Sequence, residues 1–412
     1  MQLRHRRGSV LLSYEMNVHR GETLRQFWRS IDDYVVPVRD RMPAGIGAHG
    51  FGIAPRIGID LAAELRTQRA QLNLRDALAD RGLFAFTINA FPLQHFHARR
   101  VKEQVYAPPW NKAARATTTN AIARILSTLL PDGVIGTVST LGGGYRSWGH
   151  AAPQFRRIAH NYLRTVRELV EIERATGKRI LLTVEPEPDT TFETASDVIE
   201  LFEQYIAPEM RAQLQQPLGV SAARAETLLR RHFQVNLDVC HQSVLFRDPI
   251  KEWRQLERAG LRVGKLHLTS ALVLTNAGRS QAGVAQLRDF HEPRYLHQFA
   301  ARESGGDVLR GSDLPELDRI DMSDVDEVRC HFHVPLSRAR FGRLTTTRND
   351  TAAALAHALA KSDPPHLVVE TYTWPLLAAG DARQQIVSGI TREMRWVLGQ
   401  IPAATDARLR RR

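Results

Sequence analysis

The sequence predicts an α/β protein that forms a single (β/α)8 barrel, and two features support this prediction. Apolar runs of strand length alternate with helical patterns along most of the chain, an order typical of parallel strands joined by crossover helices. A chain of 412 residues has room for about eight such units, the number that closes a barrel. No Gly-x-Gly-x-x-Gly pattern follows the first predicted strand, which disfavours a dinucleotide-binding sheet.

The predicted strands number nine, so one of them either lies outside an eight-stranded barrel or is not a strand. In chain order they cover residues 9–17, 45–53, 83–90, 133–140, 179–185, 233–239, 262–269, 328–334 and 366–372. Two of the intervening helices have clear end signals. Residues 155–177 carry one apolar stripe and end at a glycine, while residues 248–260 begin with Asp-Pro and end with Gly. Residues 276–326 show little periodicity and many charges, so we expect an elaborated loop there.

The composition is that of a folded chain, with 43% hydrophobic and 24% charged residues, which excludes the disordered and collagen-like classes. No apolar run reaches the roughly 18 residues of a membrane span. The apolar stretch behind the basic N-terminus is too short for the core of a signal peptide. The only cysteines, Cys240 and Cys330, cannot form a disulfide framework, so we expect a cytoplasmic protein.

The formal net charge of +12 is of the kind that attracts nucleic acids or anionic membranes. Seven of these surplus charges, however, lie at the two ends: Arg4, Arg6, Arg7, Arg408, Arg410, Arg411 and Arg412. We therefore predict a basic tail over residues 1–12, one barrel domain over residues 13–400 and a second basic tail over residues 401–412. We expect a small-molecule metabolite rather than nucleic acid as the partner of the barrel.

The candidate functional residues follow from where the predicted strands end, because barrels of this class place their sites at the C-terminal ends of the strands. Here the apolar runs lead into carboxylates and imidazoles: Glu185, Glu187, Asp238, His241, His267, His331, His333 and Glu370. Such a set suits a divalent ion such as Mn²⁺, Zn²⁺ or Mg²⁺. We expect Glu185 to face the site and Glu187, which follows a proline, to face solvent.

The histidines leave alternatives open. His267 shares its strand face with Lys265, so it is either a ligand or a packed polar residue. His331 and His333 also share a face, and we expect at most one of them to reach a metal.

A second group of candidates lies in and after the third predicted strand, in a loop rich in donors, aromatics and prolines. The candidates for substrate binding are Asn89, His95, His97, Lys102, Tyr106, Trp110 and, after the last strand, Trp374. Such residues can hold a polyhydroxylated ligand by hydrogen bonds and stacking. The alternative is an aromatic loop that packs over the barrel mouth. The run Gly142 to Gly144 either forms a turn or lets the backbone approach a ligand.

Six motifs together resemble one known family. They are SYEMNVHRGET (13–23), FTINAFPLQHFHARRVKEQVYAPPW (86–110), VEPEPDTTFET (184–194), LDVCHQSV (237–244), FHVPL (332–336) and VETYTW (369–374). The resemblance is to the EboE family, bacterial proteins of metabolite traffic that are similar to xylose-isomerase-like TIM barrels of the sugar isomerase/epimerase group. It spans about residues 13–400.

The resemblance implies a xylose-isomerase-like barrel that holds a divalent metal ion through a Glu, an Asp, a His and a further carboxylate. By position, these ligands are Glu185, Asp238, Glu370 and a histidine, for which the candidates are His241, His267 and His333. It also implies a place in the biosynthesis or export of a secondary metabolite, with a membrane prenyltransferase among the proteins of the same pathway.

Three hypotheses about function follow. In the first, a metal-dependent isomerase or epimerase acts on a hydroxycarbonyl metabolite, with Glu185 and Glu370 as the catalytic acid and base and with His95, His97 and Lys102 orienting hydroxyl groups. In the second, the barrel is a non-catalytic accessory protein that binds a precursor for export. In the third, it is a metal-dependent hydrolase akin to endonuclease IV, which would use the positive charge.

Overall fold

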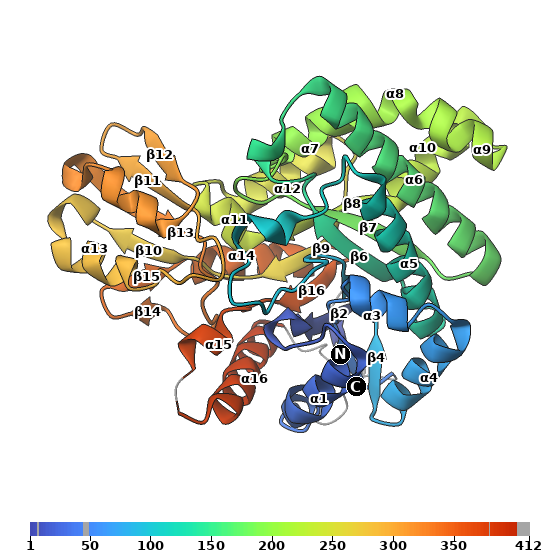
Figure 1. The fold of residues 1–412 in the computed structure, drawn as a ribbon, viewed down its shortest axis with the longest axis horizontal. Coiled ribbons are helices and arrows are strands. Elements are labelled where there is room, and N and C mark those ends of the chain that lie inside the picture. The colour runs from blue at the N-terminus through green and yellow to red at the C-terminus, as the bar shows by residue number, and fades with distance from the viewer. Residues whose placement is uncertain (6–7, 44–48, 379, 402–412) are drawn as a thin grey trace, which may run out of the picture.

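The computed structural model describes residues 1–5, 8–43, 49–378 and 380–401, and it confirms the predicted (β/α)8 barrel (Figure 1). The barrel strands are β2 (Gly8–Tyr14), β3 (Phe51–Ile53), β4 (Leu83–Ala85) with β5 (Thr87–Asn89), β6 (Gly136–Leu141), β7 (Ile180–Glu185), β8 (Phe233–Asp238), β9 (Val263–Leu268) and β16 (His366–Val369). Seven of these elements form one parallel sheet, in the order β2-β16-β9-β8-β7-β6-β5, and β3 pairs with β4. A parallel bridge between Glu15 and Ala54 joins β2 to β3 and closes the ring.

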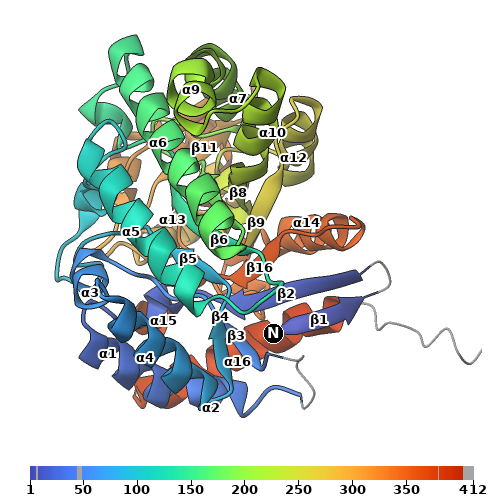
Figure 2. The same ribbon diagram turned by 90° about the vertical axis from the view of Figure 1, so that its right-hand side faces the viewer.

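Helices cover the outside of the barrel, and Figure 2 shows α4, α5 and α6 side by side. The main helices are α1 (Leu24–Ser30), α3 (Ile59–Glu64), α4 (Gln68–Ala79), α5 (Ala113–Leu129), α6 (Ala152–Thr176), α7 (Ala195–Leu201), α10 (Ala222–His232), α11 (Val239–Val244), α12 (Pro249–Arg258), α14 (Arg348–Leu359) and α16 (Ala382–Gln400). Both helices with predicted end signals are confirmed. Gly177 ends α6 with a φ of 72°, and Asp248 caps α12 by accepting from Ile250 N at 2.8 Å. Among the described residues we find no helix with the length and apolar character of a membrane span.

The ninth predicted strand lies outside the barrel. Between β9 and β16 the chain builds a second, antiparallel sheet in the order β12-β11-β13-β10-β15-β14, which lies to one side of the barrel (Figure 1). Its strands are β10 (Leu272–Thr275), β11 (Phe299–Glu303), β12 (Val308–Gly311), β13 (Val325–Cys330), β14 (Arg340–Phe341) and β15 (Leu344–Thr346). The strand predicted over residues 328–334 is β13. The region expected as a loop over residues 276–326 belongs to this inserted sheet, which has a hydrophobic core of its own.

The N-terminal residues that we expected to form a basic tail include β1 (Gln2–His5) and most of β2, which pair antiparallel. Met1 is fully buried, and its amino group donates to Leu12 O at 2.5 Å. Arg6, Arg7 and residues 402–412, which carry most of the terminal arginines, lie outside the described residues, as do residues 45–48 of the second predicted strand.

Candidate metal centre

Four of the predicted ligands meet at the C-terminal ends of β7, β8, β9 and β16. They are Glu185, Asp238, His267 and Glu370, which each offer one ligand atom, and these atoms all lie within 4.8 Å of one another. The strand register explains the meeting, because Asp238 pairs with His267 and Glu370 directly follows Val369 beside Leu268. All four side chains are buried.

His267 lies in the middle of these carboxylates. Its Nδ1 is 2.9 Å from Glu185 Oε1, 3.4 Å from Glu370 Oε2 and 3.5 Å from Asp238 Oδ2. Its Nε2 is 3.1 Å from Oε1 of Glu15, which follows β2. Burial opposes protonation, but Glu185 and Glu370 outweigh it and raise the pKa of His267 well above its ordinary value.

Lys265 supplies the second positive charge of the barrel interior. Its ammonium group donates to Glu15 and, at 2.9 Å, to Ser139 Oγ. Glu15 is fully buried, and although burial alone would raise its pKa, Lys265 and His267 lower it. Lys265 lies two residues before His267 in β9, and its ion pair holds Glu15 against the base of the candidate centre.

Glu370 lies among more negative than positive side chains, and its pKa reflects this repulsion. Asn17 Nδ2 donates to Glu370 Oε1 at 2.7 Å. Burial raises the pKa of Glu370 to about 8; His267 opposes this shift, and the negative charges of Glu185 and Glu15 add to it. A divalent cation at this position would reduce the same repulsion.

The four residues fit such an ion by chemistry as well as by position. Asp238 Oδ1 accepts hydrogen bonds from His241 N at 2.9 Å and Thr269 Oγ1 at 2.7 Å. Asp238 Oδ2, in contrast, is buried and finds no hydrogen-bond partner among the described residues. A buried carboxylate oxygen without a donor is costly, and three carboxylates with one imidazole suit Mn²⁺, Zn²⁺ or Mg²⁺.

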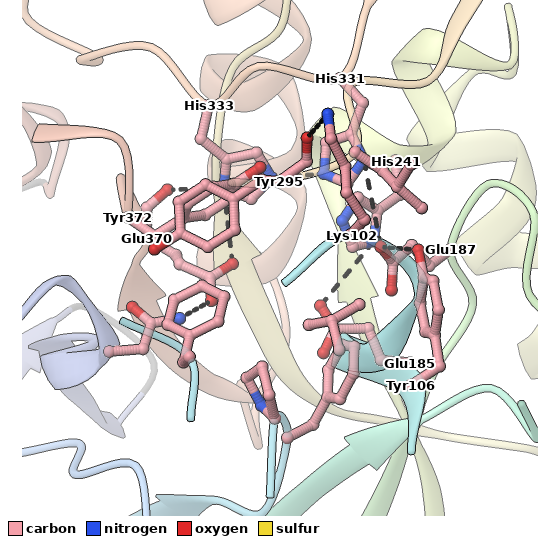
Figure 3. A pocket seen from close by; sticks show the side chains of 16 residues that line it. Lys102, Tyr106, Glu185, Glu187, His241, Tyr295, His331, His333, Glu370 and Tyr372 are labelled. Carbon is pink, nitrogen blue, oxygen red and sulfur yellow. Dashed lines mark hydrogen bonds and ion pairs between the residues drawn. The ribbon is translucent and has the colours of Figure 1, made fainter. Parts of the chain in front are cut away.

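Three further histidines lie beside this centre, on the side of the inserted sheet. His241 stands in α11, directly after β8, whereas His331 and His333 follow β13 in a segment without regular structure. All three side chains are buried and line the same cavity (Figure 3). We expected at most one of His331 and His333 to reach the site. The chain leaves β13 at Cys330, and both side chains point into the cavity, so both lie close enough to be candidate ligands.

Glu187 also faces inward, so the prediction that it faces solvent is wrong. A turn closed by Thr190 N and Glu187 O, 3.1 Å apart, follows the proline, and the carboxylate accepts from Tyr106 Oη at 3.0 Å. Burial, with the charge of Glu185, raises the pKa of Glu187 well above its ordinary value.

The cavity over these groups has aromatic walls. They include Tyr106, Tyr295 and Tyr372 (Figure 3), together with Phe91 and Phe96. Of the predicted substrate-binding residues, Lys102 and Tyr106 line it. The Lys102 ammonium group already donates to Tyr295 O at 2.6 Å, Glu292 O at 3.1 Å and Asp313 Oδ2 at 2.6 Å. His97 lines a neighbouring cavity, where its ring lies 2.8 Å from His19 O.

The other predicted substrate-binding residues do not line this cavity. Trp110 is fully buried and donates to Thr140 Oγ1 at 2.9 Å, and Trp374 donates to Glu393 Oε2 at 2.6 Å. Asn89 accepts from Phe91 N at 3.0 Å, which fixes the turn after β5. His95 is exposed.

Several residues of the site were absent from the sequence-based set. Glu15 and Asn17 follow β2, and Glu15 carries the same signal as the predicted ligands, a carboxylate directly after an apolar run. Tyr295 and Gln298 come from the inserted sheet, where no periodic pattern marks them.

No protein-family model and no curated protein matches the sequence. Among solved structures, a xylose isomerase-like TIM-barrel protein from Mycobacterium smegmatis, in complex with magnesium, is similar at 12% identity, with a TM-score of 0.48 and coverage of 95% of this chain and 98% of that one. A xylose isomerase domain protein from Planctomyces limnophilus is similar at 11% identity and a TM-score of 0.48, covering 95% and 97%. The IOLI protein with a bound zinc atom follows at 12% identity and a TM-score of 0.47, covering 95% and 99%.

Proposed function

We propose that this protein is a metal-dependent isomerase or epimerase of a small hydroxycarbonyl metabolite. An isomerase would move a proton between neighbouring carbons, and an epimerase would remove a proton from one face of a carbon and return one to the opposite face. The observation that carries the proposal is the buried group of Glu185, Asp238, His267 and Glu370 at the floor of a cavity. A divalent cation held there would polarise two adjacent oxygens of such a substrate and stabilise the negative charge that develops on them.

The chain's own carboxyl groups can carry the proton. Glu185 and Glu370 approach the same point from β7 and β16. Glu370 is the candidate acid. Glu185 is the candidate base.

The walls of the cavity favour a small polar ligand. The rings of Phe91, Tyr295 and Tyr372 exclude water from the floor, and the tyrosine hydroxyl groups and Asn17 can hydrogen-bond to hydroxyl groups of a substrate. The resemblance to the EboE family supports secondary metabolism as the setting, with pathway proteins such as a membrane prenyltransferase as partners.

The first test is the metal content of protein purified without added metal and then dialysed against Mn²⁺ or Zn²⁺. We expect bound metal in the wild type and, in the double variant Glu185→Gln/Asp238→Asn, the loss of the ion that the four residues would hold. As a matched control, Glu252→Gln alters a buried carboxylate that caps α7 by accepting from Ala195 N at 2.8 Å, away from the centre. A wild type with less than about a tenth of an ion per chain, and with no uptake, would contradict the proposal.

The second test separates an enzyme from a binding protein. Metal-loaded protein is incubated in deuterated water with a panel of ketoses and other hydroxycarbonyl compounds, and carbon-bound deuterium is followed by NMR. An isomerase or epimerase incorporates deuterium next to the carbonyl of its substrate. Binding of a panel compound without any incorporation would instead support the non-catalytic accessory protein.

A further inference from the structure

The three histidines beside the candidate centre have their ring nitrogens arranged in a common way. Each Nδ1 faces an oxygen: Pro186 O lies 3.1 Å from His241, Gln298 Oε1 lies 2.7 Å from His331, and Glu370 O lies 3.0 Å from His333. A backbone carbonyl can only accept a hydrogen bond. The Nδ1 atoms of His241 and His333 must therefore carry the proton.

The amide of Gln298 fixes the third ring in the same way. Its Nε2 donates to Pro188 O at 3.2 Å, which can only accept, and to Tyr106 Oη at 2.9 Å. The other amide atom, which faces His331 Nδ1, is therefore the oxygen, and His331 Nδ1 is the donor. In a neutral imidazole with a proton on Nδ1, the lone pair lies on Nε2.

The lone pairs of His331 and His333 lie close together, and the ring of His241 lies beside both rings. His331 Nε2 lies only 3.2 Å from His333 Nε2, and the ring of His241 lies with its centroid 4.7 Å from that of His331 and 5.7 Å from that of His333. Two lone pairs at 3.2 Å repel each other unless a cation lies against both. Histidines that bind a metal through one nitrogen typically donate the other N–H to a carbonyl or amide oxygen, as all three do here.

Asp238 connects this group with the four-residue centre. Its unpartnered Oδ2 is 3.5 Å from His267 Nδ1 on one side and 4.0 Å from His333 Nε2 on the other. The ligand atoms of Asp238, His241 and His333 lie within 4.8 Å of one another, as do those of Glu187, His241 and His331. The carboxylate of Asp238 can thus contact both an ion in the four-residue centre and an ion among the histidines.

We propose that His241, His331 and His333 bind a second metal ion, and that Asp238 bridges it to the ion of the four-residue centre. The second site rests on the proposed function only through this shared Asp238. Three imidazole donors select Zn²⁺ or a related transition ion and disfavour Mg²⁺, which prefers oxygen ligands. From the sequence, His241 and His333 were alternatives to His267 as the one histidine ligand; here they are assigned to a separate ion.

The test counts ions. Full-length protein is stripped with a chelator, dialysed against Zn²⁺ and then against metal-free buffer, and analysed for zinc per chain by mass spectrometry. We expect about two ions in the wild type and about one in the double variant His331→Gln/His333→Gln. The control His95→Gln alters an exposed histidine of the same barrel mouth and keeps two.

A second variant keeps the test decisive if the double variant does not fold. His241→Gln changes the group from the barrel side, in α11, and is also expected to bind one ion, with near-UV circular dichroism as the check of folding. A wild type that binds one ion, lost in Glu185→Gln/Asp238→Asn, overturns the second site and leaves the proposed function intact. A wild type that binds none overturns both, and a folded histidine variant that still binds two ions overturns the ligand assignment.

Discussion

Lys102 ties the loop after β5 to the inserted sheet through three acceptors, two backbone carbonyls and the carboxylate of Asp313. Its side chain is buried, with an exposed fraction of 6% against 16% for Asp313. We expect Lys102→Met to lower the free energy of unfolding by about 3 kcal/mol, because it leaves a partly buried carboxylate without its counter-ion. Urea unfolding checks this. The exposed Lys112→Met should change stability by less than about 0.5 kcal/mol, and equal effects of the two substitutions would contradict the prediction.

His366 gives the protein a predictable sensitivity to acid. It lies at the start of β16, at the opposite end of the barrel from the metal centre, with Nδ1 3.0 Å from Thr137 Oγ1. Burial, with the nearby charge of Lys265, lowers the pKa of His366 to about 3. As the pH falls below about 6.5, the unfolded chain takes up a proton that the folded chain does not, so stability decreases until about pH 3 is reached.

The expected slope from His366 is at most about 1.4 kcal/mol per pH unit. His366→Asn should make the loss of thermal stability between pH 6.5 and pH 4 shallower, measured by scanning fluorimetry against the exposed His95→Asn. An unchanged slope in His366→Asn would show that other groups dominate the acid response.

At the residue scale, the sequence could predict side chains whose direction is set by a strand end. Glu185, Asp238 and Glu370 each follow a buried apolar run, and parallel strands bring such positions together. The tryptophans could not be assigned in this way. The local sequence does not distinguish an indole that donates a hydrogen bond to Thr140 or Glu393 from an indole that stacks on a ligand.

At the element scale, the glycine turn after β6 packs against the backbone of Glu185, one of the candidate ligands. A Cβ on Gly142 would lie 2.7 Å from Phe192 O and 2.8 Å from Glu185 O. The sequence left open whether the run Gly142 to Gly144 forms a turn or lets the backbone approach a ligand. At Gly142 the backbone does approach a neighbour closely, but this neighbour is the protein's own backbone at the end of β7. Gly143, with a φ of 90°, makes the turn itself.

We expect Gly142→Ala to destabilise the protein by about 1–3 kcal/mol, as overpacking does. Because the clash pushes on Glu185 O, it should also weaken metal binding, measured by zinc titration with a competing chelator. Gly21→Ala is the matched control, since no atom lies within 4 Å of its Cβ and its φ is not positive. Equal metal affinity in the two variants would show that the β7 end tolerates the shift.

The elements differ in how far the sequence could predict them. Barrel strands such as β7 and β8 are buried at every position. Strand β7 begins as a continuous apolar run, whereas β8 buries Gln234 and Asn236 between its apolar residues. Strand β13 alternates in its second half, where Val328 and Cys330 are buried and Arg329 between them is half-buried, which is the pattern of a sheet with one solvated face. Treating its apolar end as a barrel strand produced the surplus ninth strand.

At the scale of the whole molecule, the proposed pair of ions would join two separately packed cores. Zn²⁺ loading should therefore slow amide exchange in both, over residues 180–187, 233–241 and 366–370 of the barrel and over residues 328–334 of the inserted sheet. Hydrogen–deuterium exchange with mass spectrometry measures this. In the His331→Gln/His333→Gln variant, the protection should be confined to the barrel, and protection over 328–334 that persists would contradict the bridging arrangement.

The overall architecture was predictable from the repeated strand–helix order, but the second sheet was not. Its strands β12, β14 and β15 have only two to four residues, and their pairing depends on partners far away in the chain. Tyr295, which lines the cavity, and Gln298, which contacts His331, were therefore outside the reach of local patterns.

The inserted sheet leaves and rejoins the barrel at one place, because Leu272 at its start pairs with Thr346 at its end. Evolution can therefore lengthen, shorten or exchange everything between these two residues without moving a barrel strand. The three carboxylates and His267 of the centre stay with the barrel in such an exchange, while His331, His333 and Tyr295 go with the insert. If the proposed function holds, proteins that share this barrel can keep the four-residue centre while they acquire new ligand preferences from a replaceable segment.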